Sequence, residues 1–166
     1  KGVGALYIRP GLPLPPFIHG GGQEGNYRSG TENLPGICGF AAACESADAQ
    51  AEIAQMKALR DYCRERAAEI PGLVLIGKQD APHIVNLSLP GLRSQGIINC
   101  LQTRGIYVSA GSACSKGHRS HVLEAMHLSP AVIDGSVRVS FCADNTKEDV
   151  DALIEALQEA KKTLKG

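Results

Sequence analysis

The stretch from His19 to Asn33 reads HGGGQEGNYRSGTEN and stands directly before an alanine-rich segment, Leu34 to Ala49, that predicts a helix. Its three consecutive glycines allow positive φ and a close approach of the backbone to a partner. Arg28, Ser29 and Thr31 then supply donors suited to a phosphate, and a helix N-terminus also favours anions. The same residues fit an ordinary glycine-rich turn with helix caps. Neither the P-loop nor the dinucleotide fingerprint is present.

The rest of the chain is organised around this stretch. Residues 3–8 predict a strand, and a proline- and glycine-rich loop leads from it to Gly22. The patterns that follow predict helices over 34–49, 51–70, 94–103, 121–126 and 146–164, and strands over 73–76, 84–89, 106–108 and 137–141. We expect an α/β or α+β small domain at 51–166, preceded by residues 1–50 that look like the end of something larger.

Bulk composition is that of a globular protein with no net charge. Seventeen basic and seventeen acidic side chains cancel, which gives no reason to expect direct binding to nucleic acid or to an anionic membrane. No run of about 18 apolar residues predicts a transmembrane helix. The first residues carry neither an initiator Met nor a signal-peptide layout, so we expect a fragment or a cleaved product.

One of the six cysteines stands apart from the others. Cys114 lies in SAGSACSKGH, residues 109–118, and is followed by Lys116, His118 and Arg119. Cationic neighbours lower a thiol pKa and raise the thiolate fraction that a nucleophile needs. A core cysteine in a Gly/Ser turn is the alternative, but these neighbours are too polar for a core. Most of the other cysteines have apolar neighbours and are expected in the core, in a reducing, cytoplasmic setting without disulfides.

A zinc site is the competing interpretation of the same region. Cys114, His118 and His121 have the spacing C-x3-H-x2-H, with Cys142 as a distant fourth ligand. Structural zinc sites usually pair their ligands in two clusters, and no second cluster exists here. His121 also falls where a helix is expected to pack. We therefore predict no metal.

A third segment, GSVRVSF at 135–141, carries a single arginine on a predicted strand. Arg138 alternates with Val137 and Val139, so it points to the opposite face. A guanidinium fixed on a strand is a good bidentate clamp for a carboxylate, although many strands carry an exposed arginine only for solubility.

Together, the three segments in this order resemble the cysteine desulfurases of the NifS/IscS type, pyridoxal-phosphate (PLP) enzymes of the class V aminotransferase family. The resemblance covers essentially the whole chain. It rests on KGVGALY at 1–7, HGGGQE and RSGTEN within 19–33, GSACSKG at 111–117 and SVRVSF at 136–141. It implies an α/β fold: the C-terminal small domain of a fold-type I PLP-dependent transferase at 51–166, and the end of its large domain at 1–50.

The resemblance also implies a reaction and the residues that carry it. Sulfur is removed from L-cysteine to give L-alanine and an enzyme persulfide, which serves acceptors such as an Fe–S scaffold protein or a tRNA-thiolation enzyme. Cys114 matches the persulfide carrier and Arg138 the clamp for the substrate carboxylate. Thr31 matches the ligand that binds the PLP phosphate across a homodimer, and Arg28 and His19 belong to the same cofactor-binding segment.

The resemblance places the Schiff-base lysine outside this chain, because Lys1 matches a later lysine of the family. We therefore expect the chain alone to be inactive. Two alternatives stay open. One is a selenocysteine lyase or another class V enzyme that does not need the cysteine. The other is a PLP-independent sulfur-carrier or binding domain that uses Cys114.

Overall fold

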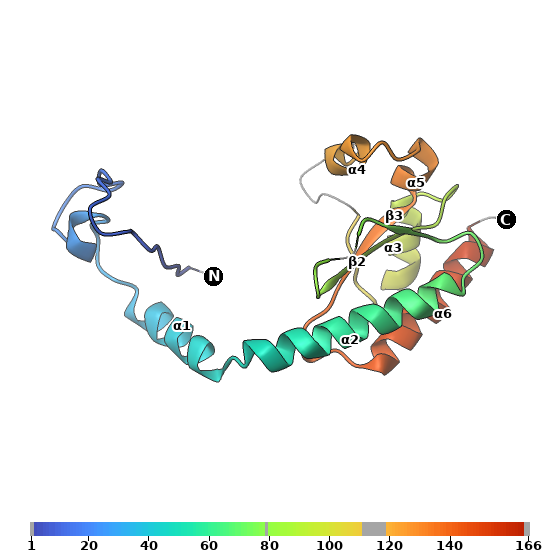
Figure 1. Cartoon of the computed structure of the whole chain (residues 1–166), viewed down its shortest axis with the longest axis horizontal. Coiled ribbons are helices and arrows are strands. Elements are labelled where there is room, and N and C mark those ends of the chain that lie inside the picture. The colour runs from blue at the N-terminus through green and yellow to red at the C-terminus, as the bar shows by residue number, and fades with distance from the viewer. Residues whose placement is uncertain (1, 79, 111–118, 165–166) are drawn as a thin grey trace. The chain divides into compact units, whose positions relative to one another are not determined.

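The computed structural model describes residues 2–78, 80–110 and 119–164. Contacts divide the chain into two units, Lys1–Asp48 and Ala49–Gly166, whose elements are labelled in Figure 1. No helix within the described ranges combines the length and the apolar content that crossing a bilayer requires.

The first unit contains a short 3-10 turn, η1 (Glu24–Asn26), and one long helix, α1 (Leu34–Ser46). The predicted helix is confirmed. It begins where Asn33 caps it, with the side-chain oxygen accepting a hydrogen bond from Gly36 N at 3.3 Å. The predicted strand at 3–8 is wrong. A strand needs a hydrogen-bonded neighbour along its length, and the described part of this unit offers only one isolated bridge, Ile18 to Arg28.

The described part of the first unit has no hydrophobic core of its own. Among its described residues only Ser29 is buried, and α1 buries none of its side chains. Phe17 is 89% exposed and Tyr7 84%. Apolar side chains of this size stabilise a fold only when they are removed from water, so the unit lacks the usual driving force for independent folding.

The second unit has three strands and five helices in its described part. The strands are β1 (Val74–Ile76), β2 (Ile84–Ser88) and β3 (Ser136–Ser140). The helices are α2 (Ala49–Ala68), α3 (Ser94–Gln102), α4 (His121–Ala125), α5 (Pro130–Asp134) and α6 (Lys147–Thr163).

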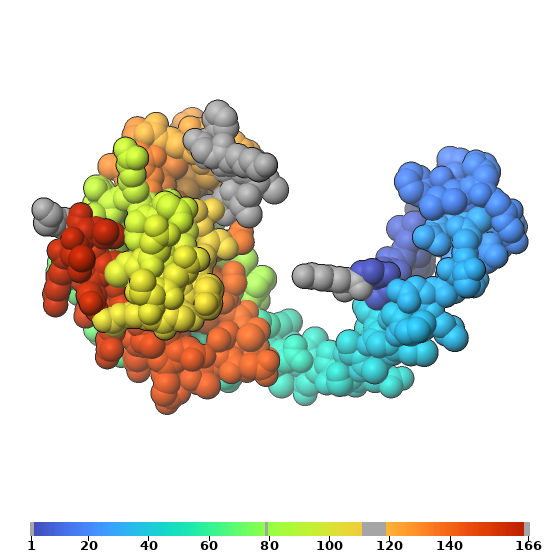
Figure 2. All heavy atoms as spheres, turned by 180° about the vertical axis from the view of Figure 1, so that it is seen from behind, coloured from blue at the N-terminus to red at the C-terminus, as the bar shows by residue number. Residues whose placement is uncertain are grey.

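The strands form an antiparallel sheet in the order β1-β2-β3. Val85 and Leu87 pair with Val139 and Val137, and together they present one apolar face. Helices α2, α3 and α6 cover that face and form the main core (Figure 1). Figure 2 shows α3, in yellow, beside the red end of α6.

The opposite face of the sheet is covered only in part. A second, smaller cluster joins Ile76 of β1 to Leu123 of α4 and Ile133 of α5. Ser88 Oγ donates to Val132 O at 2.7 Å, which ties α5 to the sheet. Arg138 lies on this same face because it pairs with Asn86, which in turn pairs with Ile76. The sheet therefore separates the main core from the face that carries Arg138.

Most elements predicted for the second unit are confirmed, with shifts of a few residues at their ends. Residues 106–108 are not a strand: the segment pairs with β3 one residue later, at Ser109, as an isolated bridge to Arg138. Helix α5 was not predicted. With five residues and Pro130 at its start, it is too short to display a helical period.

Candidate functional site

Arg138 is fixed at the backbone from both sides. It lies in β3, between β2 and residue 109. Its N–H donates to Ser109 O at 2.7 Å, and Ser109 N donates to Arg138 O at 3.1 Å. This pair of bonds brings Ser109, where the segment that contains Cys114 begins, onto the strand that carries the predicted clamp.

The guanidinium of Arg138 is half-buried on the partly covered face of the sheet. Its Nε is buried and makes no hydrogen bond to any described residue. Buried donors of this kind are normally satisfied, so this Nε–H is available to a partner from outside the described residues. A carboxylate that accepts from an arginine in bidentate fashion is the partner that this geometry suits best.

A second contact fixes the chain after residue 118. Arg119 donates to the two carboxylate oxygens of Asp134, from Nε at 2.7 Å and from Nη2 at 2.8 Å. This hydrogen bond is the main reason why the pKa of Asp134 lies below its usual value. In the sequence, Arg119 is recognisable only as a cationic neighbour of Cys114, and Asp134 carries no signal at all. No sequence signal links two residues that are fifteen positions apart and on separate elements.

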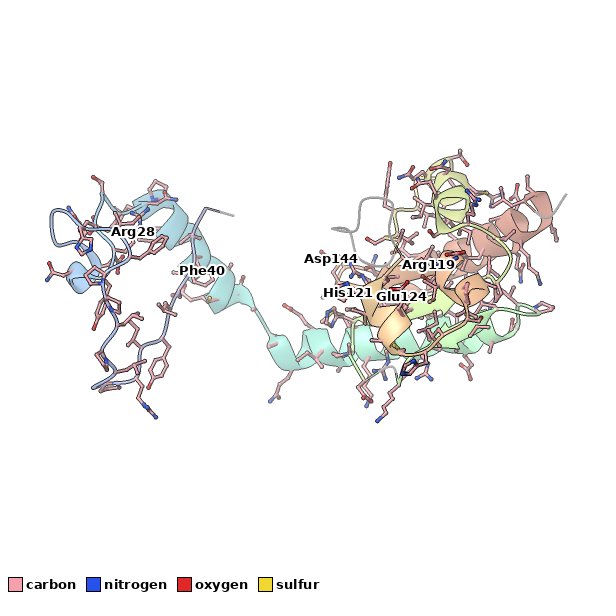
Figure 3. The ribbon with its side chains drawn as sticks, turned by 90° about the horizontal axis from the view of Figure 1, so that it is seen from above. Arg28, Phe40, Arg119, His121, Glu124 and Asp144 are labelled. Atoms are coloured by element: carbon pink, nitrogen blue, oxygen red, sulfur yellow. The ribbon has the colours of Figure 1, made fainter. Side chains whose placement is uncertain are left out.

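Cys114 itself lies outside the described residues, as does His118. The zinc interpretation is therefore tested only at its other two positions. His121 is exposed at the first residue of α4 (Figure 3), so the expectation that it packs is wrong. The packing position of this short helix is Leu123, two residues later.

The expectation that most of the other cysteines lie in a core is also wrong. Of these five, only Cys63 is buried; Cys38, Cys44 and Cys142 are exposed and Cys100 is intermediate. Burial raises the pKa of the Cys63 thiol to about 12, which leaves it protonated and unreactive at neutral pH. Apolar neighbours in the sequence predict burial only where the element has a packing partner, and α1 has none among the described residues of its unit.

The glycine-rich stretch forms a compact loop in the first unit. Ser29 N donates to Ile18 O at 3.0 Å, and Gly22 N donates to Ser29 Oγ at 3.4 Å. Gly22 has φ of 87°, in the region that favours glycine. A Cβ on Gly20 would lie 3.0 Å from the Ser29 Cβ, so small residues are needed where this loop closes.

The three residues predicted to bind a cofactor, His19, Arg28 and Thr31, are exposed in this segment. Arg28 and Thr31 precede the N-terminus of α1, and Arg28 Nη1 also donates to Ser29 O at 3.4 Å. Figure 3 marks Arg28 in this loop. The structure thus groups these three predicted residues in one unit, while Arg138 and Ser109 are grouped in the other.

The chain matches the family "Aminotransferase class-V" over residues 1–153. It belongs to this family. The class-V chain is 40% identical to the cysteine desulfurase IscS of Methanosarcina thermophila, over all of this chain and 43% of that protein. It is also 40% identical to the IscS of Dictyoglomus turgidum, over 95% of this chain and 42% of that protein. The chain spans about two fifths of the length of these curated relatives.

Solved structures confirm the predicted α/β fold of the class-V chain. A NifS-like protein superposes with a TM-score of 0.83 at 36% identity, over 95% of this chain and 42% of that one. A NifS-like protein from Rickettsia africae gives a TM-score of 0.77 at 28% identity, over 91% and 41%. The resemblance inferred from the motifs is thereby confirmed at the level of family and fold.

Enzymes of the class-V family are generally PLP-dependent, and the exposed donors of the first unit fit the phosphate of such a cofactor. A guanidinium (Arg28) and a hydroxyl (Thr31) precede a thirteen-residue helix whose N-terminus adds partial positive charge. A phosphate is bound in proteins by this combination of donors.

Proposed function

We propose that the class-V chain is part of a PLP-dependent cysteine desulfurase. The observation that carries the proposal is the pair of hydrogen bonds between Ser109 and Arg138. They connect an arginine with an unpaired, buried Nε to the base of the segment that contains Cys114. The names and identities of the relatives support the same activity.

In this proposal Arg138 binds and orients the substrate. Its planar guanidinium presents paired N–H donors to a carboxylate, so it holds the α-carboxylate of L-cysteine at a fixed place on the sheet face. The backbone bonds to Ser109 keep the strand and the start of the cysteine segment in register.

Cys114 receives the sulfur. Its thiolate attacks the sulfur of the bound L-cysteine, an S–S bond forms, and the carbon–sulfur bond breaks with its electron pair remaining on the substrate carbon. That carbon gains a proton and the product leaves as L-alanine, while the persulfide stays on Cys114. When bound, PLP would supply an electron sink for charge at the α-carbon, which neighbours the β-carbon that loses the sulfur.

The cofactor is bound in this proposal by three residues of the first unit: Thr31, Arg28 and His19. Thr31 donates its hydroxyl to the PLP phosphate across a homodimer, and Arg28 adds positive charge beside it. Residues 1–50 are then the end of the large domain and residues 51–166 the small domain. The absence of a core among the described residues of the first unit supports this, because a piece of a larger domain exposes the side chains that its remainder would cover.

Sulfur acceptors are proteins in this proposal, such as an Fe–S scaffold protein or a tRNA-thiolation enzyme, in the reducing cytoplasm. Transfer of sulfur to such a protein requires that the Cys114 persulfide reach a thiol of the acceptor. The sequence carries no net charge that would suggest direct contact with nucleic acid.

The decisive experiment uses the intact protein with PLP and L-cysteine. We expect L-alanine to be released in step with persulfide at Cys114, identified by mass spectrometry after thiol trapping. Cys114→Ala should abolish both, whereas Cys142→Ala, which removes another exposed thiol, should leave both unchanged. Full turnover of L-cysteine by Cys114→Ala would contradict the proposal and favour a lyase that does not use this cysteine.

Residues 1–166 alone should release no alanine, because the family resemblance places the Schiff-base lysine outside them. Incubating residues 1–166 with a persulfide donor in place of L-cysteine tests the alternative of a PLP-independent sulfur-carrier domain. Persulfide on Cys114 that is passed on without PLP would favour a sulfur-carrier domain.

A further inference from the structure

The segment that contains Cys114 is held at both ends by one stretch of chain. Ser109 is bonded to Arg138 before the segment, and Arg119 is bonded to Asp134 after it. Asp134 and Arg138 lie only four residues apart, around the start of β3. The two ends are therefore anchored four residues apart, one at the last residue of α5 and the other in β3.

Asp134 is a firm anchor because its surroundings cannot shift easily. Ile133 beside it is buried, and Ser136 Oγ donates to Ile133 O at 2.8 Å. Leu89 N donates to Gly135 O at 3.1 Å, and a Cβ on Gly135 would lie 2.3 Å from Leu89 O. The backbone on either side of Asp134 is thus packed against the end of β2.

Arg119, by contrast, begins a part of the chain that has few other attachments. Helix α4 is only five residues long, and Ser120 at its N-cap makes no side-chain capping bond in the described structure. A helix this short is not stable by itself. In the described structure its attachments include Leu123, packed against Ile76 and Ile133, and the ion pair that precedes it. Figure 3 shows Arg119 close to His121 and Glu124 of α4.

We propose that Arg119 is a positioning residue, whose bidentate ion pair with Asp134 fixes the end of the Cys114 segment to the end of α5, directly before the strand that carries Arg138. The inference rests on the proposed function. The pair sets where the thiol segment returns to the fold, and so how often the thiol reaches the sulfur of a substrate held by Arg138. A bidentate arginine–carboxylate pair has the fixed geometry that most surface ion pairs lack.

The neighbouring charges favour the same arrangement. Arg93 adds to the effect of Arg119 in lowering the pKa of Asp134, and Glu124 adds to that of Asp134 in raising the pKa of Arg119. Both partners are therefore fully charged at neutral pH. Their side chains are 47% and 41% exposed, so the pair can be removed without leaving a buried charge.

The test compares Arg119→Gln, Asp134→Asn and the double variant in the intact enzyme with PLP. The control is Arg104→Gln, because Arg104 forms a similarly exposed ion pair with Glu159 in the same unit. We expect Arg119→Gln to slow single-turnover persulfide formation on Cys114 about three- to tenfold. L-cysteine should bind as tightly as before, measured by the absorbance change of bound PLP. The double variant should be no slower than either single variant.

A second measurement does not depend on activity. Backbone amide exchange at Glu124 and Met126, which bond to Ser120 O and Val122 O, should accelerate in Arg119→Gln and not in Arg104→Gln. The inference would be overturned if Arg119→Gln left both persulfide formation and amide exchange unchanged. It would also be overturned if this variant weakened L-cysteine binding by as much as it slowed persulfide formation. If the unmodified enzyme forms neither alanine nor persulfide, the proposed function fails, and the exchange result alone decides whether Arg119 anchors the segment.

Discussion

In the unit Ala49–Gly166, helices close over one face of a sheet and partly over the other, whereas in Lys1–Asp48 the apolar side chains face solvent. Helices α1 and α2 follow one another in the chain and are both rich in alanine, yet only α2 buries residues, among them Leu59 and Cys63. The difference is the presence of packing partners. An apolar helix adds to stability only where another element removes its side chains from water.

The largest expected effect comes from separating the two units. Residues 49–166 expressed alone should fold cooperatively, because both apolar clusters lie within them. Residues 1–48 alone should show no cooperative transition, because Ser29 is their only buried residue in the described structure. Thermal unfolding followed by circular dichroism measures both. A cooperative thermal transition of residues 1–48 alone would show that the first unit also folds independently and contradict the prediction.

Matched leucine substitutions sharpen the comparison within residues 1–166. Leu87 is fully buried in the central strand β2, so Leu87→Ala should lower the free energy of unfolding by about 2–5 kcal/mol. Leu34, at the start of α1, is 65% exposed, and Leu34→Ala should change it by less than about 0.5 kcal/mol. Urea unfolding gives both values. Equal losses would mean that Leu34 is buried in solution.

Two glycines provide a smaller and opposite pair of effects. Gly135→Ala should destabilise the second unit by about 1–3 kcal/mol, because its Cβ would clash with Leu89 O. Gly39 lies inside α1, and a Cβ added there would meet no atom within 4 Å. Gly39→Ala should therefore raise the helix content of α1, because alanine favours a helix over glycine by about 1 kcal/mol. Unfolding curves and far-UV circular dichroism measure the two. Tolerance of alanine at 135 would mean that β2 can move away.

The smallest effect is a difference in pH dependence between the two helix caps. Thr146 and Asp149 form a capping box on α6, and hydrogen bonds, first from Asn145 and then from Thr146, hold the pKa of Asp149 below its usual value. A lowered folded-state pKa contributes stability that is present above about pH 4 and is lost as pH falls below it. Helix α1 is capped by the neutral Asn33 and lacks this dependence.

Thermal melts between about pH 6 and pH 2.5 test this last contrast. Asp149→Asn should flatten the fall in melting temperature of the second unit, and Asn33→Ala should lower α1 helicity equally at every pH. An unchanged acid profile in Asp149→Asn would show that the capping carboxylate does not contribute.

Sequence periodicity was sufficient for elements that carry their own signals. Helix α6 was predictable from its capping residues and apolar stripe, and β3 from the alternation around Arg138. Periodicity failed where a partner decides the outcome. Residues 3–8 have strand composition but no paired strand in the described structure, and the exposed Cys38 and Cys44 have apolar sequence neighbours but no cover.

By itself, the sequence determined the family, the α/β class and the residue types of the candidate site, because motifs and periodicities are local and are written in consecutive residues. Only the tertiary structure decided that Ser109 bonds to Arg138, that Arg119 is held by Asp134, and that the described part of the first unit has no core of its own. These features depend on contacts between residues distant in the chain. Such contacts follow from how strands and helices pack, which no single stretch of sequence specifies.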